Sequence, residues 1–94
     1  MLVEKPREYL RYAYAQHFAM PAFNVCNLEM AKAVIEAATI ERAPVIVQTY
    51  SGDLAHASFG EGLGSMPSII KGLAAQTSVP VFLHMDHGPS FEFD

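Results

Sequence analysis

The alternation of strand-length apolar runs with segments of helical periodicity constrains the fold of this chain most strongly. The apolar runs cover residues 18–25, 44–49 and 79–88, and helical patterns separate them. The middle run, PVIVQT, is rich in β-branched residues without polar alternation, which is typical of a strand covered on both faces in a parallel sheet. This order of strands and helices predicts a parallel α/β sheet with right-handed crossovers.

Local signals set the expected boundaries of the two crossover helices. Asn27 can cap the first, which should end near Arg42 because Ala43 precedes a proline. Ser65 and Pro67 supply start signals for the second. The expected apolar stripes are Leu28, Ala31, Ile35 and Ala38 in the first helix, and Met66, Ile69, Ile70 and Leu73 in the second.

The remaining segments are less regular. A short amphipathic helix is expected over residues 6–17, with Pro6 at its first position. Pro21 cannot donate a hydrogen bond to a sheet, so the regular part of the first strand is expected to cover only 22–25. Residues 54–64 are rich in glycine and serine and are expected to form a loop.

Polar residues fall at the carboxyl ends of all three expected strands. Asn24 ends the first, Gln48 and Ser51 end the second, and Asp86 with His87 ends the third. Active sites of TIM barrels are assembled at this place, from the ends of several strands. A doubly wound sheet is the alternative, but no G-x-G-x-x-G fingerprint follows the first strand. The expected fold class is therefore α/β, the N-terminal βαβαβ portion of a TIM (β/α)8 barrel, preceded by a short N-terminal helix.

The chain is too short to form a complete barrel. It has 94 residues, of which 51% are hydrophobic and 17% charged, whereas a complete barrel needs about 250 residues. Residues 1–94 are therefore expected to be the N-terminal fragment of a single barrel domain, with about three of its eight strands. Alone, this fragment would leave both outer strands unpaired and one face of the sheet uncovered.

Composition excludes several classes of partner. The net charge is -4, lysine and arginine total 6, and no basic run is present, which argues against nucleic acid. No apolar run approaches the roughly 18 residues of a membrane span. Residues 1–10 lack the features of a secretory signal. Cys26 is the only cysteine, which excludes an intrachain disulfide and favours a cytoplasmic setting.

The third strand end concentrates three ionisable side chains. Alternation along the strand places His84 and Asp86 on the same face, and His87 follows immediately. Imidazole is a common metal ligand and carboxylate a common general acid or base. The cluster therefore indicates a fragment of a metal-dependent catalytic centre, and on spacing alone an ordinary polar strand end is the alternative.

Three segments together carry a resemblance to a known family. They are PAFNV at 21–25 with the Asn-Leu-Glu that starts the next helix, APVIVQ at 43–48, and VPVFLHMDHG at 79–88. With these motifs the chain resembles the class II, metal-dependent fructose-bisphosphate and tagatose-bisphosphate aldolases. The resemblance implies a zinc-dependent TIM barrel that usually forms a homodimer or homotetramer. It also implies reversible cleavage of a ketose 1,6-bisphosphate, a sugar phosphate, into dihydroxyacetone phosphate and an aldehyde such as glyceraldehyde 3-phosphate.

The resemblance also implies roles for individual residues. Asp86 matches the catalytic acid and base, and His87 matches the first ligand of the Zn²⁺ ion that stabilises the enediolate. His84 matches a supporting histidine, and Asn24 a residue that contacts substrate or the enediolate. Several family members carry a serine or threonine associated with a substrate phosphate where this chain has Tyr50. Either Ser51 takes this role through a shifted turn, or the aldehyde-side substrate differs.

Other functions fit the same residues. A non-catalytic or truncated aldolase-like subunit would keep the fold and lose the reaction. A different metal-dependent barrel, such as a hydrolase, would use His84 and His87 as paired ligands. The identity of the sugar, the physiological metal and the number of subunits do not follow from the sequence.

Overall fold

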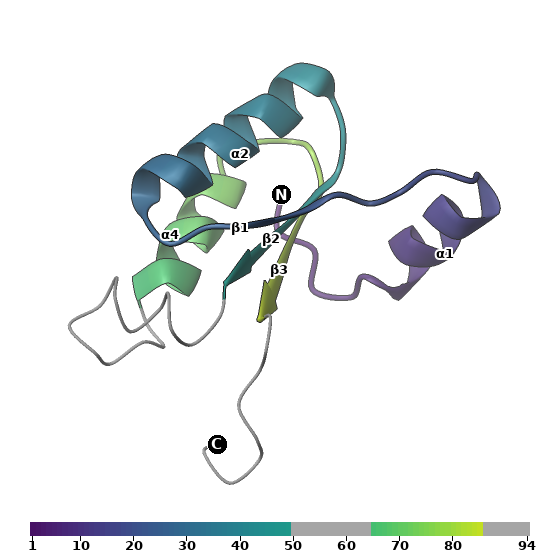
Figure 1. The fold of residues 1–94 in the computed structure, drawn as a ribbon, viewed down its shortest axis with the longest axis horizontal. Coiled ribbons are helices and arrows are strands. Elements are labelled where there is room, and N and C mark those ends of the chain that lie inside the picture. The colour runs from purple at the N-terminus through teal and green to yellow at the C-terminus, as the bar shows by residue number, and fades with distance from the viewer. Residues whose placement is uncertain (50–64, 86–94) are drawn as a thin grey trace, which may run out of the picture.

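The fold is a three-stranded parallel sheet with helices on both sides (Figure 1). The computed structural model describes residues 1–49 and 65–85. Its elements are α1 (Arg7–Ala15), β1 (Ala22–Asn24), α2 (Leu28–Glu41), β2 (Val45–Thr49), α4 (Ser65–Ala74) and β3 (Val81–Met85). The strands lie in the order β1-β2-β3 and pair in parallel, which confirms the predicted α/β alternation. The loop predicted over 54–64 lies outside the described residues.

Helices α2 and α4 cover one face of the sheet (Figure 1). Of the stripe predicted for α2, Leu28 is exposed, and it is the first residue of the helix. Within the described residues, no helix is long and apolar enough to cross a membrane. The core between the helices and the sheet consists of Val25, Ala31, Ile35, Ala38, Val45, Val47, Met66, Ile70, Ala74, Val79 and Val81.

Helix α2 begins and ends where its sequence signals predict. The Asn27 side chain accepts a hydrogen bond from the backbone N–H of Met30 at 2.8 Å, which satisfies one of the free donors of the first turn. At the other end Arg42 adopts a left-handed conformation with φ 54°, and its N–H bonds to the carbonyls of the last turn. The strand β2 then starts one residue after Pro44.

Removal of this cap is expected to destabilise the chain. Asn27→Ala should lower the free energy of unfolding by about 1 kcal/mol, because the Met30 N–H loses its partner. Urea unfolding followed by circular dichroism measures the change, and Asn27→Asp, which keeps an acceptor oxygen, is the matched control. Equal midpoints for wild type and Asn27→Ala would show that the cap contributes nothing to stability.

The first helix and the first strand are shorter than the full apolar patterns. Pro6 is the N-cap of α1 rather than its first helical residue, and the helix ends at Ala15 because His17 turns left-handed with φ 60°. The strand β1 starts after Pro21, as predicted, and ends at Asn24, one residue before the expected end at Val25. Pro21 has no N–H to offer, but its carbonyl accepts from the N–H of Ile46 at 2.9 Å. The proline therefore joins the sheet as an acceptor only.

The expectation that both outer strands lack partners is wrong for β3. Leu2 forms a parallel bridge with Val81, in which the N–H of Val3 donates to Val81 and the N–H of Val81 donates to Met1, each at 2.8 Å. The Met1 amino group donates to the carbonyl oxygens of Thr77 and Val79, both at 2.6 Å, and partial burial lowers the pKa of that amino group. The reason is that the segment before α1 runs along the outer edge of the sheet and meets the backbone groups at the start of β3.

Candidate active site at the carboxyl ends of the strands

A row of three polar residues crosses the sheet near the carboxyl ends of its strands. In the register of the parallel ladders, Asn24 lies beside Gln48, and Gln48 lies beside His84. These residues share one face because side chains alternate along a strand and their positions match across the ladder. The structure therefore brings together a carboxamide from β1, a carboxamide from β2 and an imidazole from β3.

This row lies on the face of the sheet that points away from α2 and α4, which we call the inner face. Residues adjacent to the row, Val47 and Thr49 on β2, are buried under the two helices, whereas Gln48 between them is only half-buried. Asn24 and His84 are exposed. The polar row therefore lies on the face of the sheet that α2 and α4 do not cover.

Gln48 and His84 are joined by a side-chain hydrogen bond. The Nδ1 atom of His84 lies 3.1 Å from the Oε1 atom of Gln48. The two residues are directly opposite each other in the β2–β3 ladder, so the backbone register holds them at this distance. The sequence shows both residues at strand ends, but their pairing becomes visible only when the two strands are aligned in parallel.

Aromatic residues form the layer next to this row on the inner face. Phe82 is two residues before His84 on β3 and is only 4% exposed. The ring of Tyr9 from α1 packs edge-on against it, with centroids 5.2 Å apart and an interplanar angle of 77°. Helix α1 lies on the side of the sheet opposite α4 (Figure 1). Tyr9 therefore covers the part of the inner face around Phe82. The polar row lies beyond this part, toward the carboxyl ends of the strands.

The structure describes only one of the residues predicted to take part directly in the reaction. Asn24 is at the end of β1, as expected. Ser51, Asp86 and His87 lie outside the described residues, so their predicted roles stay predictions. The described part of the chain contains no group of three or more His, Cys, Asp or Glu residues that could hold a metal ion.

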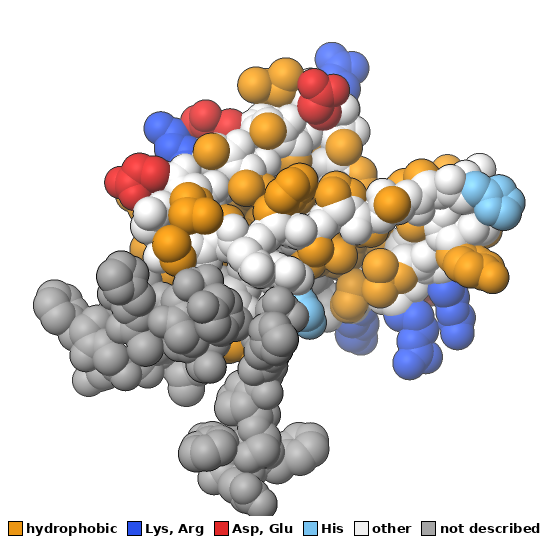
Figure 2. Space-filling model, in the orientation of Figure 1, with side chains coloured by type: hydrophobic (Ala, Val, Ile, Leu, Met, Phe, Trp, Pro, Cys, Tyr) orange, Lys and Arg blue, Asp and Glu red, His pale blue; other side chains and the backbone are white. Residues whose placement is uncertain are grey.

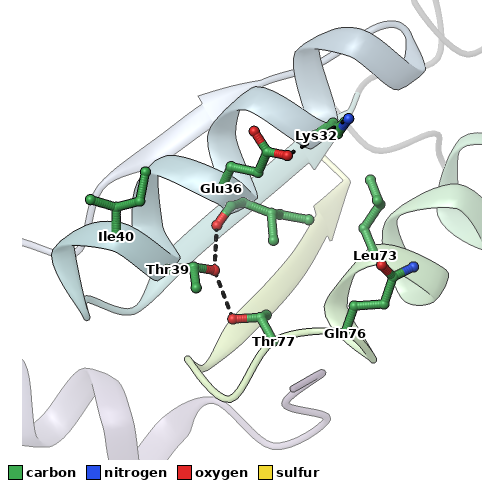
Figure 3. Close-up of a pocket in the computed structure, with 8 residues that line it drawn as sticks. Lys32, Glu36, Thr39, Ile40, Leu73, Gln76 and Thr77 are labelled. Carbon is green, nitrogen blue, oxygen red and sulfur yellow. Dashed lines mark hydrogen bonds and ion pairs between the residues drawn. The ribbon is translucent and has the colours of Figure 1, made fainter.

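A separate groove of about 380 Å³ lies on the outer side of the helices (Figure 3). No strand contributes to its lining, which consists of Lys32, Ile35, Glu36, Thr39, Ile40, Leu73, Gln76 and Thr77. Its hydroxyl groups are occupied by the fold itself. Thr39 donates to the carbonyl of Ile35 at 2.7 Å and lies 2.7 Å from the Thr77 hydroxyl, which accepts from the N–H of Val79. The two threonine hydroxyls of the groove therefore tie α2 to the segment after α4.

The sheet, its helices and the polar strand ends define the class of this chain as the N-terminal α/β portion of a TIM barrel. Two solved structures agree with this fold. The YdjI aldolase from Escherichia coli K12 is 35% identical with a TM-score of 0.86, over 98% of this chain and 34% of that one. A fructose-bisphosphate aldolase from Campylobacter jejuni is 30% identical with a TM-score of 0.78, over 90% of this chain and 28% of that one.

The sequence profile of the family "Fructose-bisphosphate aldolase class-II" matches residues 4–93. This chain belongs to the class II fructose-bisphosphate aldolase family. The fructose-bisphosphate aldolase of Mycoplasma pneumoniae is 40% identical over 84 residues, which are 87% of this chain and 28% of the relative. That of Helicobacter pylori is 34% identical over 92 residues, which are 98% of this chain and 29% of the relative. The chain thus spans less than a third of the curated relatives that it matches.

Proposed function

We propose that this chain supplies the first three strands of a class II aldolase barrel, in a protein that reversibly cleaves a ketose 1,6-bisphosphate. The products are dihydroxyacetone phosphate and an aldehyde such as glyceraldehyde 3-phosphate. The observation that carries the proposal is the polar row of Asn24, Gln48 and His84 at the carboxyl edge of the sheet. The family's LH-x-DHG motif continues directly from that edge.

Two residues that follow β3 carry the chemistry in this proposal. The Asp86 carboxylate takes the proton from the hydroxyl on the carbon that becomes the aldehyde, and returns it in the condensation direction. His87 is the first ligand of a divalent cation, which we propose to be zinc. The cation supplies Lewis-acid stabilisation of the negative charge left when the carbon-carbon bond breaks. Asn24 and Ser51 bind the substrate.

The positions of the lysines support a reaction without a Schiff base in this portion of the barrel. Lys32 and Lys71 lie in helices α2 and α4, and Lys5 precedes α1. The Lys32 ammonium lies 3.7 Å from the Glu36 carboxylate on the exposed face of α2. None of the three reaches the inner face of the sheet from a strand end.

An uncovered apolar flank supports the larger barrel. A groove of about 370 Å³ runs between β1 and α2, and Phe23 is 49% exposed beside it. Hydrophobic side chains gather along α2 and β1 in the space-filling view (Figure 2). A β-strand and a helix from the rest of a barrel would cover this flank. We further propose that the assembled protein is a cytoplasmic homodimer or homotetramer.

A fusion protein tests this function. Residues 1–94 are joined to the part of the Mycoplasma pneumoniae aldolase that follows its matching segment, and cleavage of fructose 1,6-bisphosphate is measured with and without a chelator. We expect chelator-sensitive cleavage by the fusion, as by the unmodified relative. A folded but inactive fusion beside an active relative would favour the non-catalytic subunit.

The isolated chain is expected to be inactive. Residues 1–94 offer one proposed zinc ligand, His87, whereas a catalytic zinc site uses three protein ligands. We expect no detectable cleavage and no zinc retained after dialysis, measured by metal analysis. Robust chelator-sensitive cleavage by the isolated chain would overturn the proposal that it is one portion of a barrel.

A further inference from the structure

The hydrogen bond between Gln48 and His84 determines which nitrogen of the His84 ring carries the hydrogen. A carboxamide oxygen only accepts hydrogen bonds, so the Nδ1 atom that lies 3.1 Å from the Gln48 Oε1 must carry the hydrogen. In a neutral imidazole the Nε2 atom then keeps its lone pair. Histidine free in water prefers the opposite tautomer, with the proton on Nε2. The contact therefore selects the less common form.

The surroundings keep this arrangement in place. The β2–β3 ladder pairs the two residues directly, and Gln48 is half-buried between Val47 and Thr49, which are buried under the helices. The contact with Gln48 uses the Nδ1 atom of the His84 ring, so Nε2 is the ring nitrogen left for another partner.

The neutral side chains of the polar row indicate which chemical group of a ligand the row would bind. Asn24 and Gln48 are neutral amides, and no lysine or arginine of β1, β2 or β3 is present to bind a phosphate. Amide groups and an imidazole lone pair are suited to hydroxyl groups, which both donate and accept hydrogen bonds. The row is therefore matched to the hydroxylated part of a sugar phosphate rather than to its phosphate.

We propose that Gln48 is a positioning residue that holds His84 in the Nδ1–H tautomer, so that His84 Nε2 accepts a hydrogen bond from a substrate hydroxyl. The identity of the ligand rests on the proposed function, whereas the tautomer does not. The ring then orients the hydroxylated carbon chain at the edge where β3 ends.

Nitrogen-15 NMR of the 94-residue chain tests the tautomer directly. Long-range correlations of the His84 ring are recorded with the imidazole neutral, and the β2–β3 ladder is verified by the protected amides of Val47 and Phe82. We expect the His84 hydrogen on Nδ1 in the wild type. In Gln48→Met, which has no acceptor oxygen, we expect the hydrogen on Nε2 instead. Gln48→Glu, which keeps an acceptor oxygen, should retain Nδ1–H, and Ile46→Val on the same face is the matched control.

The hydroxyl preference is tested in the same samples with glycerol phosphate and inorganic phosphate at equal concentrations. We expect glycerol phosphate to shift the His84 Nε2 resonance and inorganic phosphate to leave it in place. A hydrogen on Nε2 in the wild type with the ladder formed would overturn the positioning role. Equal shifts with both additives, or none with either, would overturn the hydroxyl assignment. An inactive fusion with an intact Nδ1–H tautomer would count against the proposed function alone.

Discussion

Asp86→Ala in the fusion protein is expected to lower the rate of fructose 1,6-bisphosphate cleavage by at least about 100-fold, while the bound zinc is retained. A positioned general acid or base contributes roughly 10²–10⁴-fold, and alanine has no group that can take the substrate proton. His87, the proposed zinc ligand, is untouched, so metal affinity should not change. Steady-state turnover and the zinc content of the same preparation are the two measurements.

A matched carboxylate separates this role from a general effect of charge. Glu36→Gln removes one negative charge from the exposed face of α2, where Glu36 pairs with Lys32. Exposed pairs of this kind contribute about 0–1 kcal/mol, so this variant should keep wild-type turnover. Turnover within a factor of two of the wild type in Asp86→Ala would remove Asp86 from the reaction.

His87→Ala is expected to lose the metal and, with it, turnover. Catalytic zinc is held by three protein ligands, and loss of one leaves a site too weak to retain the ion through dialysis. Metal analysis after dialysis should show zinc falling from about one ion per chain to a small fraction. Addition of zinc should restore little activity, whereas wild-type apoenzyme should recover fully.

His17→Asn is the control for histidine removal. His17 is exposed at the end of α1 with φ 60°, a conformation that asparagine tolerates. This variant should keep both zinc and activity. Equal zinc content in His87→Ala and His17→Asn would show that His87 is not a ligand.

Much of the fold follows from short-range chemistry, which explains why the sequence predicts it well. The cap at Asn27, the break before Pro44 and the start at Ser65 act within one helical turn of their residues. The start of β1 after Pro21 follows in the same way. These signals need no knowledge of where the rest of the chain lies.

The features that the sequence did not predict depend on long-range register. Gln48 pairs with His84 only because β2 and β3 align in parallel with these residues opposite each other. The residue types of the candidate site are predictions from the sequence, and the structure adds that Gln48 contacts His84.

Because Leu2 bridges to Val81, residues 1–3 can take their native positions only after β3 has been synthesised. The Met1 amino group and its partner Val79 are 78 residues apart, so on the ribosome the amino end must wait for almost the whole segment to emerge. At about 5–20 residues per second this delay is roughly 4–16 s. During that interval the outer edge of the growing sheet has no native neighbour, and a chaperone that binds early, near the exit tunnel, would meet Leu2 and Val3 unprotected.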